Sequence, residues 1–310
     1  MRSLLLLLPL GLLLASCGSD SDLPPMVTGG GIDESRAEEL YAEAQQAEQS
    51  GRTKKAAKLY EDLADDIPLS NRAAEARFRQ AKLLEEMGET LDSFDAYQML
   101  LERHQGSGYY QQALSSQSEM AFAAADGEIK NSFLGLKSKL SPDKVAGMLE
   151  KVADNAPRSR LAARAEFKIG QTYANQGGMS ASAKALAAYR GVVENYPDYP
   201  EAPEAQFAIG ELLLKDAREG NQDQANLNRA EEAFRDYLGQ FPGHKRNAEA
   251  RKLLASIDSR DVQNTYDIAV FYENKGQLDS ARYYYQEVVR KTAYGDLHEK
   301  AKARLAKLGN

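Results

Sequence analysis

One arrangement of apolar and small residues recurs along this chain of 310 residues and constrains its fold more than any other feature. A clear copy lies between Val262 and Ala293. It consists of a large–small pair, an aromatic residue, a turn glycine, and then a small, an aromatic and an apolar residue: Ile268-Ala269, Tyr272, Gly276, Ala281, Tyr285 and Val288. Spacings of three and four place such residues on one face of a helix, and glycine readily adopts the left-handed conformation that ends one. The pattern therefore predicts two helices joined by a tight turn.

The same register recurs elsewhere in the chain. Copies without gaps lie at 37–68 and 81–100, and their turn glycines, Gly51 and Gly88, are 37 positions apart. Copies at 169–197 and 209–242 match when extra residues are allowed in the turn between the two helices. The copy at 109–157 matches worst, because residues 128–140 separate its halves and predict an insertion or an irregular connector. Residues 297–308 have a helical period and predict a short helix that closes the array.

The offsets and the spacing resemble those of the tetratricopeptide repeat, whose period is about 34 residues. The resemblance implies an all-α fold, a right-handed superhelical solenoid of five to six helix hairpins in which each hairpin packs only on its neighbours. We expect residues 35–107 to form units 1 and 2, residues 108–160 an irregular unit or insertion, and residues 161–310 the C-terminal units with a capping helix. A generic bundle of Ala-rich helices is the alternative, and the three copies without gaps argue against it.

The beginning of the chain has the features of a secretory signal. Arg2 precedes an apolar run, residues 4–14, which is too short to cross a bilayer because a spanning helix takes about 20 residues. The run leads to Leu14-Ala15-Ser16-Cys17, which resembles a bacterial lipobox and contains the only cysteine of the chain. An ordinary signal peptide with a cysteine nearby by chance is the alternative.

The lipobox resemblance implies removal of residues 1–16 as a signal peptide and lipidation of Cys17. Two or more acyl chains give a stable membrane anchor, whereas one chain is marginal. Gly18, rather than Asp, follows the cysteine, and in the common sorting scheme this directs a lipoprotein to the outer membrane of a Gram-negative-type bacterium, facing the periplasm. Residues 17–34 are dense in Gly, Ser, Pro and Asp, and we expect them to form a flexible tether.

The composition argues against catalysis and nucleic-acid binding. The chain has 46 acidic and 39 basic side chains, a formal net charge of −7, whereas nucleic-acid-binding proteins carry basic surfaces. One cysteine cannot build a disulfide framework or a cysteine zinc site. The three histidines lie far apart; we expect His104 and His244 in exposed loops and His298 on a polar helix face. Because no group of catalytic residues is found, we expect no enzymatic activity, no cofactor, no metal and no small-molecule substrate.

Five of the copies carry an aromatic residue three positions before their small Gly or Ala. These residues are Tyr41, Phe78, Phe167, Phe207 and Tyr266. Gln45 and Lys82 lie one turn later in the first two copies. If the first helix of each hairpin lines the inner side of the solenoid, these side chains form a trough suited to an extended or helical peptide. The alternative is that the rings mainly pack on the next hairpin.

Together with the lipobox, the repeats resemble those of the BamD family, the tetratricopeptide lipoproteins of the outer-membrane β-barrel assembly machinery. The similarity covers most of residues 36–306 and is loose in the middle. It is carried at the beginning and at the end of the chain by Tyr41–Gly51, Ala56–Tyr60, Ala233-Phe234, Phe241-Pro242, Ala248–Arg251, Tyr266–Tyr272 and Gly276.

The resemblance implies a non-enzymatic periplasmic adaptor that binds unfolded outer-membrane barrel proteins and the barrel insertase. It assigns substrate contact to the N-terminal repeats, where the candidates are Tyr41, Gln45, Phe78 and Lys82. It assigns contact with the machinery to the C-terminal repeats, where the candidates are Tyr266 and Glu273. The alternatives are a YbgF-type scaffold that coordinates Tol–Pal and peptidoglycan processes, or a pilotin-like lipoprotein. YbgF-type proteins usually carry a coiled coil and lack a lipobox, the reverse of this chain.

Overall fold

The computed structural model describes residues 33–309 apart from residues 134–135, 220–223 and 294. The expected signal peptide at 1–16, the lipidation site Cys17 and the tether as far as residue 32 lie outside the described residues. The chain divides into two compact units, Met1–Tyr109 and Tyr110–Asn310, and each is described by itself.

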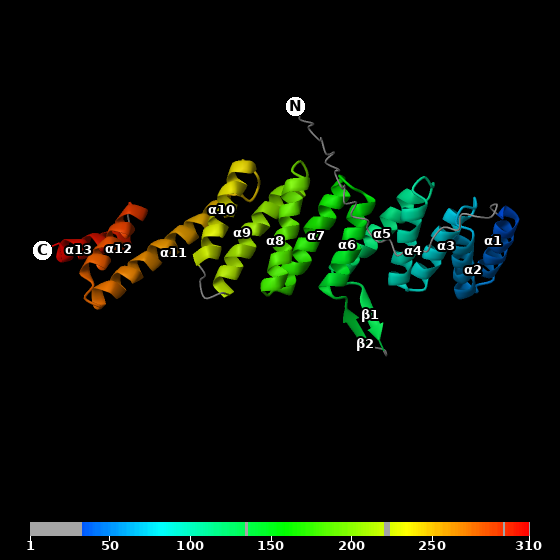
Figure 1. The fold of residues 1–310 in the computed structure, drawn as a ribbon, viewed down its shortest axis with the longest axis horizontal. Coiled ribbons are helices and arrows are strands. Elements are labelled where there is room, and N and C mark those ends of the chain that lie inside the picture. The colour runs from blue at the N-terminus through cyan, green and yellow to red at the C-terminus, as the bar shows by residue number, and fades with distance from the viewer. Residues whose placement is uncertain (1–32, 134–135, 220–223, 294, 310) are drawn as a thin grey trace, which may run out of the picture. The chain divides into compact units, whose positions relative to one another are not determined.

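The described part of unit 1 is made of two helix hairpins (Figure 1). Its helices are α1 (Glu34–Gln49), α2 (Thr53–Asp66), α3 (Ala73–Glu86) and α4 (Thr90–Arg103). Unit 2 contains four hairpins, a pair of strands and a closing helix. Its elements are α5 (Tyr110–Ala125), β1 (Lys130–Phe133), β2 (Leu136–Lys139), α6 (Pro142–Asn155), α7 (Arg160–Gln176), α8 (Met179–Asn195), α9 (Glu201–Glu219), α10 (Gln224–Gln240), α11 (Asn247–Asn274), α12 (Leu278–Lys291) and α13 (Asp296–Leu308).

Consecutive helices pack in pairs, and within each unit every pair packs on the next. This confirms the predicted solenoid of five to six helix hairpins, with six hairpins in the described residues. None of the described helices is long and apolar enough to cross a membrane.

Glycine ends the first helix of a hairpin where the pattern placed it. Gly51 and Gly276 have φ angles of 72° and 73°, in the left-handed region that costs glycine little. In each turn the next residue closes the helix end: the Arg52 N–H donates to the Ala47 carbonyl at 2.9 Å, and the Gln277 N–H donates to the Tyr272 carbonyl at 3.0 Å. These are the six-to-one hydrogen bonds of a Schellman cap, which satisfy carbonyls left over at the helix end.

An aromatic pair joins the two helices of five hairpins. The rings and their centroid separations are Tyr41–Tyr60 at 5.6 Å, Phe78–Tyr97 at 6.0 Å, Phe167–Tyr189 at 5.5 Å, Phe207–Phe234 at 5.2 Å and Tyr266–Tyr285 at 5.5 Å. The second-helix ring of each pair is almost completely buried. Such contacts stabilise a fold beyond the area that they bury.

In three hairpins the tyrosine of the second helix also donates to a glutamate at the end of the first. The hydroxyls of Tyr60, Tyr97 and Tyr285 lie 2.9, 3.1 and 2.6 Å from the carboxylates of Glu48, Glu85 and Glu273. Burial, followed by this hydrogen bond, raises the pKa of Tyr60 and of Tyr285, so both hydroxyls remain protonated donors. The bond therefore fixes the end of one helix to the middle of the other.

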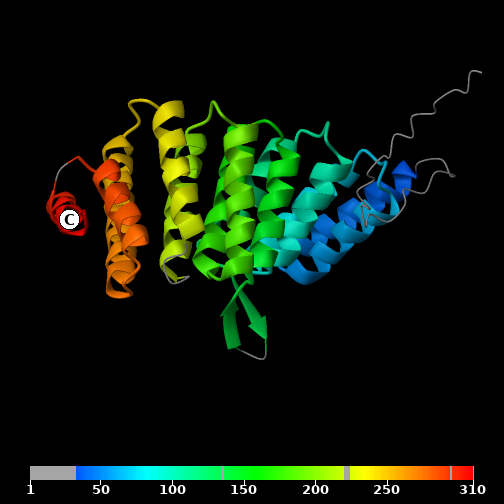
Figure 2. The same ribbon diagram turned by 60° about the vertical axis from the view of Figure 1, so that its left-hand side comes forward.

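The third copy of the repeat is a helix hairpin in which two strands lie between the helices. β1 and β2 form an antiparallel pair between α5 and α6, with Lys130 opposite Lys139 and Phe133 opposite Leu136. Figure 2 shows the two strands extending away from the ends of α5 and α6. The strands are the one departure from the predicted all-α fold among the described residues.

The last hairpin begins with a long helix. α11 is an uninterrupted helix of 28 residues and packs on both α10 and α12. The residues 248–251 and 266–272, which resemble consecutive parts of the BamD pattern, therefore lie on one continuous helix.

α13 packs on α12 at the end of the array. The expectation of a polar face at His298 is wrong, because this side of α13 turns inward: His298 is buried and its Nδ1 lies 2.6 Å from the Thr292 carbonyl oxygen. His104 and His244 are half-buried instead of exposed.

Gly170 and Gly210 allow a close approach between paired helices. A Cβ on Gly170 would lie 2.5 Å from the Tyr189 ring, and one on Gly210 would lie 2.6 Å from the Phe234 ring. Both distances are shorter than van der Waals contact, so an added methyl group would push the two helices apart. The smallest side chain is thus required where these aromatic residues cross the first helix.

We expect Gly170→Ala to lower the free energy of unfolding of unit 2 by about 1–3 kcal/mol, because overpacking exceeds the gain in helix propensity. Gly147→Ala is the matched control: Gly147 is also inside a helix, but its added Cβ would meet nothing within 4 Å. That change should stabilise the protein by about 0.5–1 kcal/mol. Thermal unfolding followed by circular dichroism measures both, and equal shifts of the two variants would contradict the close-packing argument.

Candidate protein-interaction site

A trough runs along the side of unit 2 that is formed by the first helices of its hairpins. It crosses α5, α7 and α9 and reaches the loop before α11. Its lining alternates apolar, amide and charged side chains: Phe122, Asp126, Arg160, Leu161, Arg164, Phe167, Lys168, Gln171, Pro200, Glu201, Glu204 and Lys245, continued by Ala174, Asn175, Tyr189, Ala208, Glu211 and Arg246. We call this surface the first-helix trough.

Ion pairs join neighbouring first helices along the trough. Lys168 Nζ of α7 lies 2.6 Å from Asp126 Oδ1 beside α5, and Arg160 Nε of α7 lies 3.5 Å from Glu201 Oε1 of α9. Lys245 Nζ, before α11, lies 2.7 Å from Glu204 Oε1 of α9. Partly exposed pairs add little to stability. They do distribute both signs of charge along the trough and so favour a ligand with polar groups.

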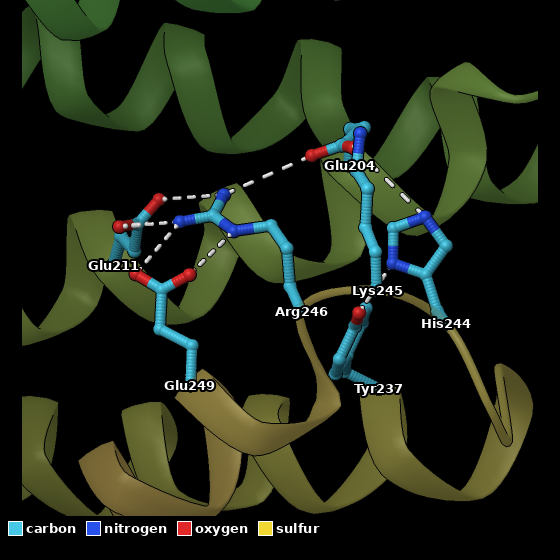
Figure 3. Close-up of polar contacts among 7 residues, drawn as sticks. All are labelled: Glu204, Glu211, Tyr237, His244, Lys245, Arg246 and Glu249. Atoms are coloured by element: carbon cyan, nitrogen blue, oxygen red, sulfur yellow. Dashed lines mark hydrogen bonds and ion pairs between the residues drawn. The ribbon is translucent and has the colours of Figure 1, made fainter.

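Arg246 lines the trough just before α11, and Figure 3 shows its contacts with three glutamates. Its guanidinium donates to Glu211 at 3.1 and 3.3 Å and to Glu249 at 2.8 and 3.1 Å, and its Nη1 lies 3.8 Å from Glu204. The same group lies 3.5 Å above the Phe207 ring. Burial works against its charge, but the hydrogen bonds that it donates to Glu249 and Glu211 outweigh burial and raise the pKa of Arg246.

His244 and Tyr237 hold the loop before α11 against the rest of unit 2 (Figure 3). The Tyr237 hydroxyl and His244 Nδ1 share a hydrogen bond of 2.5 Å, and His244 Nε2 lies 3.9 Å from Glu204 Oε1. Glu204 therefore lies within ion-pair distance of three consecutive residues, His244 to Arg246. These contacts fix the start of α11 beside α9.

The structure corrects the expected role of the aromatic residues at the repeated first-helix position. Phe207 has no exposed surface and lies beneath Arg246, so it cannot contact a partner directly. Tyr41 and Phe78 are also buried, and Phe78 lies between Tyr97 and Tyr109. The aromatic residues recur at these positions because their rings pack across their own hairpins. This packing explains the pattern without a role in a binding groove.

Other predicted site residues have mixed surroundings. Phe167 is half-buried and lines the first-helix trough. Tyr266 is half-buried against Tyr285, and the carboxylate of Glu273 already accepts from Tyr285 and from Arg304 at 3.1 Å. In unit 1, Gln45 is half-buried and Lys82 lies 2.9 Å from Glu85. Unit 1 and unit 2 each hold part of the predicted set.

Tyr41 is held by a polar cluster in unit 1. The Arg72 guanidinium lies 4.5 Å from the centre of its ring. Burial, and then the hydrogen bond with Glu75, raises the pKa of Tyr41 to about 12. Burial also opposes ionisation of Glu75, but hydrogen bonds from Tyr41, Arg72 and Tyr109 prevail and lower the pKa of this carboxyl group. The cluster is internally satisfied and positions α3 against α1.

Several residues of the trough were missed by sequence reasoning. Arg160, Arg164 and Lys168 follow one another at spacings of four on α7, and this basic row is visible in the sequence. Glu204 and Arg246 give no such signal, because their contact depends on the approach of α9 to the start of α11.

A second exposed surface lies on the last hairpin. Ile268, Phe271, Leu278 and Tyr283 are 41%, 55%, 44% and 57% exposed. The rings form a continuous row in which neighbouring centroids lie 5.2–5.5 Å apart: Phe271, Tyr272, Tyr284 and Tyr283. Tyr285 is fully buried, as its repeat position predicted, and its neighbours form this C-terminal aromatic surface. Exposed apolar groups that gather in this way indicate an interaction site.

The repeats also match a known family model. The model for the tetratricopeptide repeat matches residues 75–107 and 164–199, which correspond to parts of α3, α4, α7 and α8. The chain is a tetratricopeptide-repeat protein. Proteins of this fold are scaffolds for protein interactions, and the chain is such a scaffold.

Solved tetratricopeptide structures are similar to this chain at low identity. A thermophilic protein of Thermus thermophilus is 19% identical, with 71% of this chain and 98% of that chain covered and a TM-score of 0.31. Part of a repeat protein from Cytophaga hutchinsonii is 12% identical, with coverage of 86% and 87% and a TM-score of 0.36. PilF of Pseudomonas aeruginosa is 12% identical, with coverage of 87% and 98% and a TM-score of 0.30. No curated protein matches this chain.

The tetratricopeptide scaffold should depend on Arg246 for the part of the trough just before α11. We expect Arg246→Ala to lower the free energy of unfolding by about 1 kcal/mol at neutral pH, since it removes hydrogen bonds to partly exposed carboxylates and the contact of the guanidinium with the Phe207 ring. Arg246→Lys should restore only part of this, because an ammonium group cannot bind two carboxylates as a planar fork. Chemical denaturation of the three proteins measures the difference.

The difference in unfolding free energy between the parent protein and Arg246→Ala should decrease in acid. The hydrogen bond from Arg246 lowers the pKa of Glu249 in the native state. Such a group stabilises the fold above the pKa of its unfolded form, about 4.3, and this contribution is lost as the pH falls through the lowered native pKa. The gap between the parent and Arg246→Ala should therefore shrink below about pH 4. A gap that widens in acid would contradict the proposed pairing.

Proposed function

We propose that this tetratricopeptide scaffold is a lipid-anchored periplasmic adaptor of outer-membrane β-barrel assembly, which binds unfolded barrel proteins and the barrel insertase. The main observation in support of an adaptor is that unit 2 has two separate exposed surfaces. These are the first-helix trough on α5, α7 and α9 and the C-terminal aromatic surface on α11 and α12. A module with one ligand needs one surface, whereas an adaptor needs two. The lipobox-like Leu14–Cys17 and the BamD-like repeats support the membrane and the machinery in this proposal.

The trough suits a segment of an unfolded barrel protein. Barrel strands alternate apolar and polar side chains, so one face of an extended segment is apolar. That face would lie against Phe167 and Leu161, while its polar atoms meet Gln171 and Asn175. Gln45 and Lys82 of unit 1 remain candidates for further substrate contact, and the buried Tyr41 and Phe78 would position their helices for it.

The C-terminal aromatic surface suits a folded partner, here the insertase. Tyrosine and other aromatic residues carry much of the affinity at protein interfaces because they bury large areas at a small cost in conformational entropy. Tyr266 and Glu273 lie on the same helix as Phe271 and would support this surface from within the hairpin.

Affinity purification of the lipidated protein from membranes tests the proposal. We expect recovery of the barrel insertase, and we expect the double variant Phe271→Glu, Tyr283→Glu to lose it, since two charges would be buried at the interface. Met179→Glu is the control, because Met179 is 93% exposed on another hairpin. Recovery of Tol–Pal components or wall synthases instead would favour the YbgF-like reading, and recovery of a pilus secretin the pilotin-like reading; either result overturns the proposed function.

The membrane anchor has its own test. Cys17→Ala should release the protein into the soluble periplasm or leave an uncleaved precursor, because no acyl chain can be attached. Fractionation of cells and the mass of the N-terminal peptide distinguish these products. A mature, unlipidated form that stays entirely with the outer membrane would show that another contact holds the protein there.

A further inference from the structure

One cation of the first-helix trough is not neutralised by a carboxylate. Arg164 is exposed on α7, and within the described part of the chain no ion pair or hydrogen bond of its guanidinium is found. The other basic residues of the lining each have a carboxylate partner: Arg160 pairs with Glu201, Lys168 with Asp126, Lys245 with Glu204, and Arg246 with Glu211. Arg164 is therefore the position at which the trough can accept a negative charge.

The Arg164 guanidinium is held in place by an aromatic ring. Its central carbon lies 4.1 Å from the centre of the Phe122 ring, which is itself buried. A guanidinium stacked on a ring keeps its N–H groups in the plane, where they can bind a carboxylate in a bidentate manner. Because the group is already ordered, little conformational entropy is lost when a carboxylate binds.

A hydrogen-bond acceptor in the same trough lacks a donor. Glu201 lines the trough at the start of α9, its side chain is 12% exposed, and its Oε2 is buried without a hydrogen-bond partner among the described residues. A buried acceptor without a donor is costly. Because Oε2 has almost no accessible surface, a ligand in the trough does not contact it, and the Glu201 carboxylate stays paired with Arg160.

We propose that the first-helix trough binds peptide segments in which a carboxylate lies next to an apolar side chain. The carboxylate binds Arg164, and the apolar side chain packs on Phe167. Arg164 and Phe167 are three positions apart on α7, so their side chains are neighbours on the helix surface. This rests on the proposed binding of unfolded segments and names the chemistry that selects them.

Three fluorescent peptides test the proposal on the full chain in detergent micelles. The first has an aspartate between two phenylalanines, with both ends blocked; the second has asparagine in place of aspartate; the third has asparagine and a free C-terminal carboxylate. Fluorescence anisotropy gives the Kd of each. We expect the first to bind about tenfold more tightly than the second, the size of one charge-assisted hydrogen-bond pair. Tight binding of the third as well would mean that a terminal carboxylate is also accepted at Arg164.

Two variants assign the selectivity to Arg164. Arg164→Gln should reduce the ratio between the first two peptides to about one, and Arg164→Glu should make a lysine peptide bind better than the aspartate peptide. Arg190→Glu is the matched control, since Arg190 is exposed on α8 and lines a different groove, between α8 and α10. It should leave the ratio unchanged. Circular dichroism of each variant establishes that it is folded.

The outcomes separate this inference from the proposed function. Equal binding of the first two peptides, no binding of any peptide, or an unchanged ratio in Arg164→Gln overturns carboxylate recognition by the trough. Co-purification with the insertase does not depend on Arg164, because it uses the C-terminal aromatic surface. Recovery of the insertase by an Arg164→Gln protein would therefore leave the adaptor role in place even when the carboxylate proposal fails.

Discussion

The close approach of two helices across an aromatic pair is the interaction on which every other feature depends. A hairpin of two helices of ordinary length buries too little surface to be stable alone, so its helices must pack closely and its outer faces must be covered by neighbours. Gly170 beneath Tyr189 and Gly210 beneath Phe234 represent a tight form of this contact. The rings then set the distance between helices, and the remaining contacts follow from that distance.

The fold could be predicted from the sequence because its determinants are local. A hairpin needs small and aromatic residues at fixed offsets and a glycine in its turn, and all of these are visible within about 34 residues. The same offsets misled the prediction of the site. An aromatic residue at the repeated first-helix position is required for packing, so Phe207 and Tyr41 carry a structural signal that the sequence alone does not separate from a binding signal.

The trough depends on contacts between hairpins, and such contacts leave no periodic trace. Glu204 meets residues 244–246 only because the loop before α11 returns to α9, and the offset between them follows from the length of α10 and its flanking turns. Cation–ring contacts such as Arg164 with Phe122 join helices that are more than 40 positions apart in the chain. The basic row on α7 was visible, but which of its members lacks a carboxylate partner could be learned only from the fold.

The uninterrupted course of α11 has a mechanical consequence. Arg246 caps its first end, where it lines the trough, and Phe271 lies near its other end, on the aromatic surface. A helix of 28 residues is about 42 Å long at 1.5 Å per residue, and it has no glycine or proline along its length to act as a joint. A helix of this kind moves as one body, so a displacement of the last hairpin by a bound protein would also displace Arg246 at the trough.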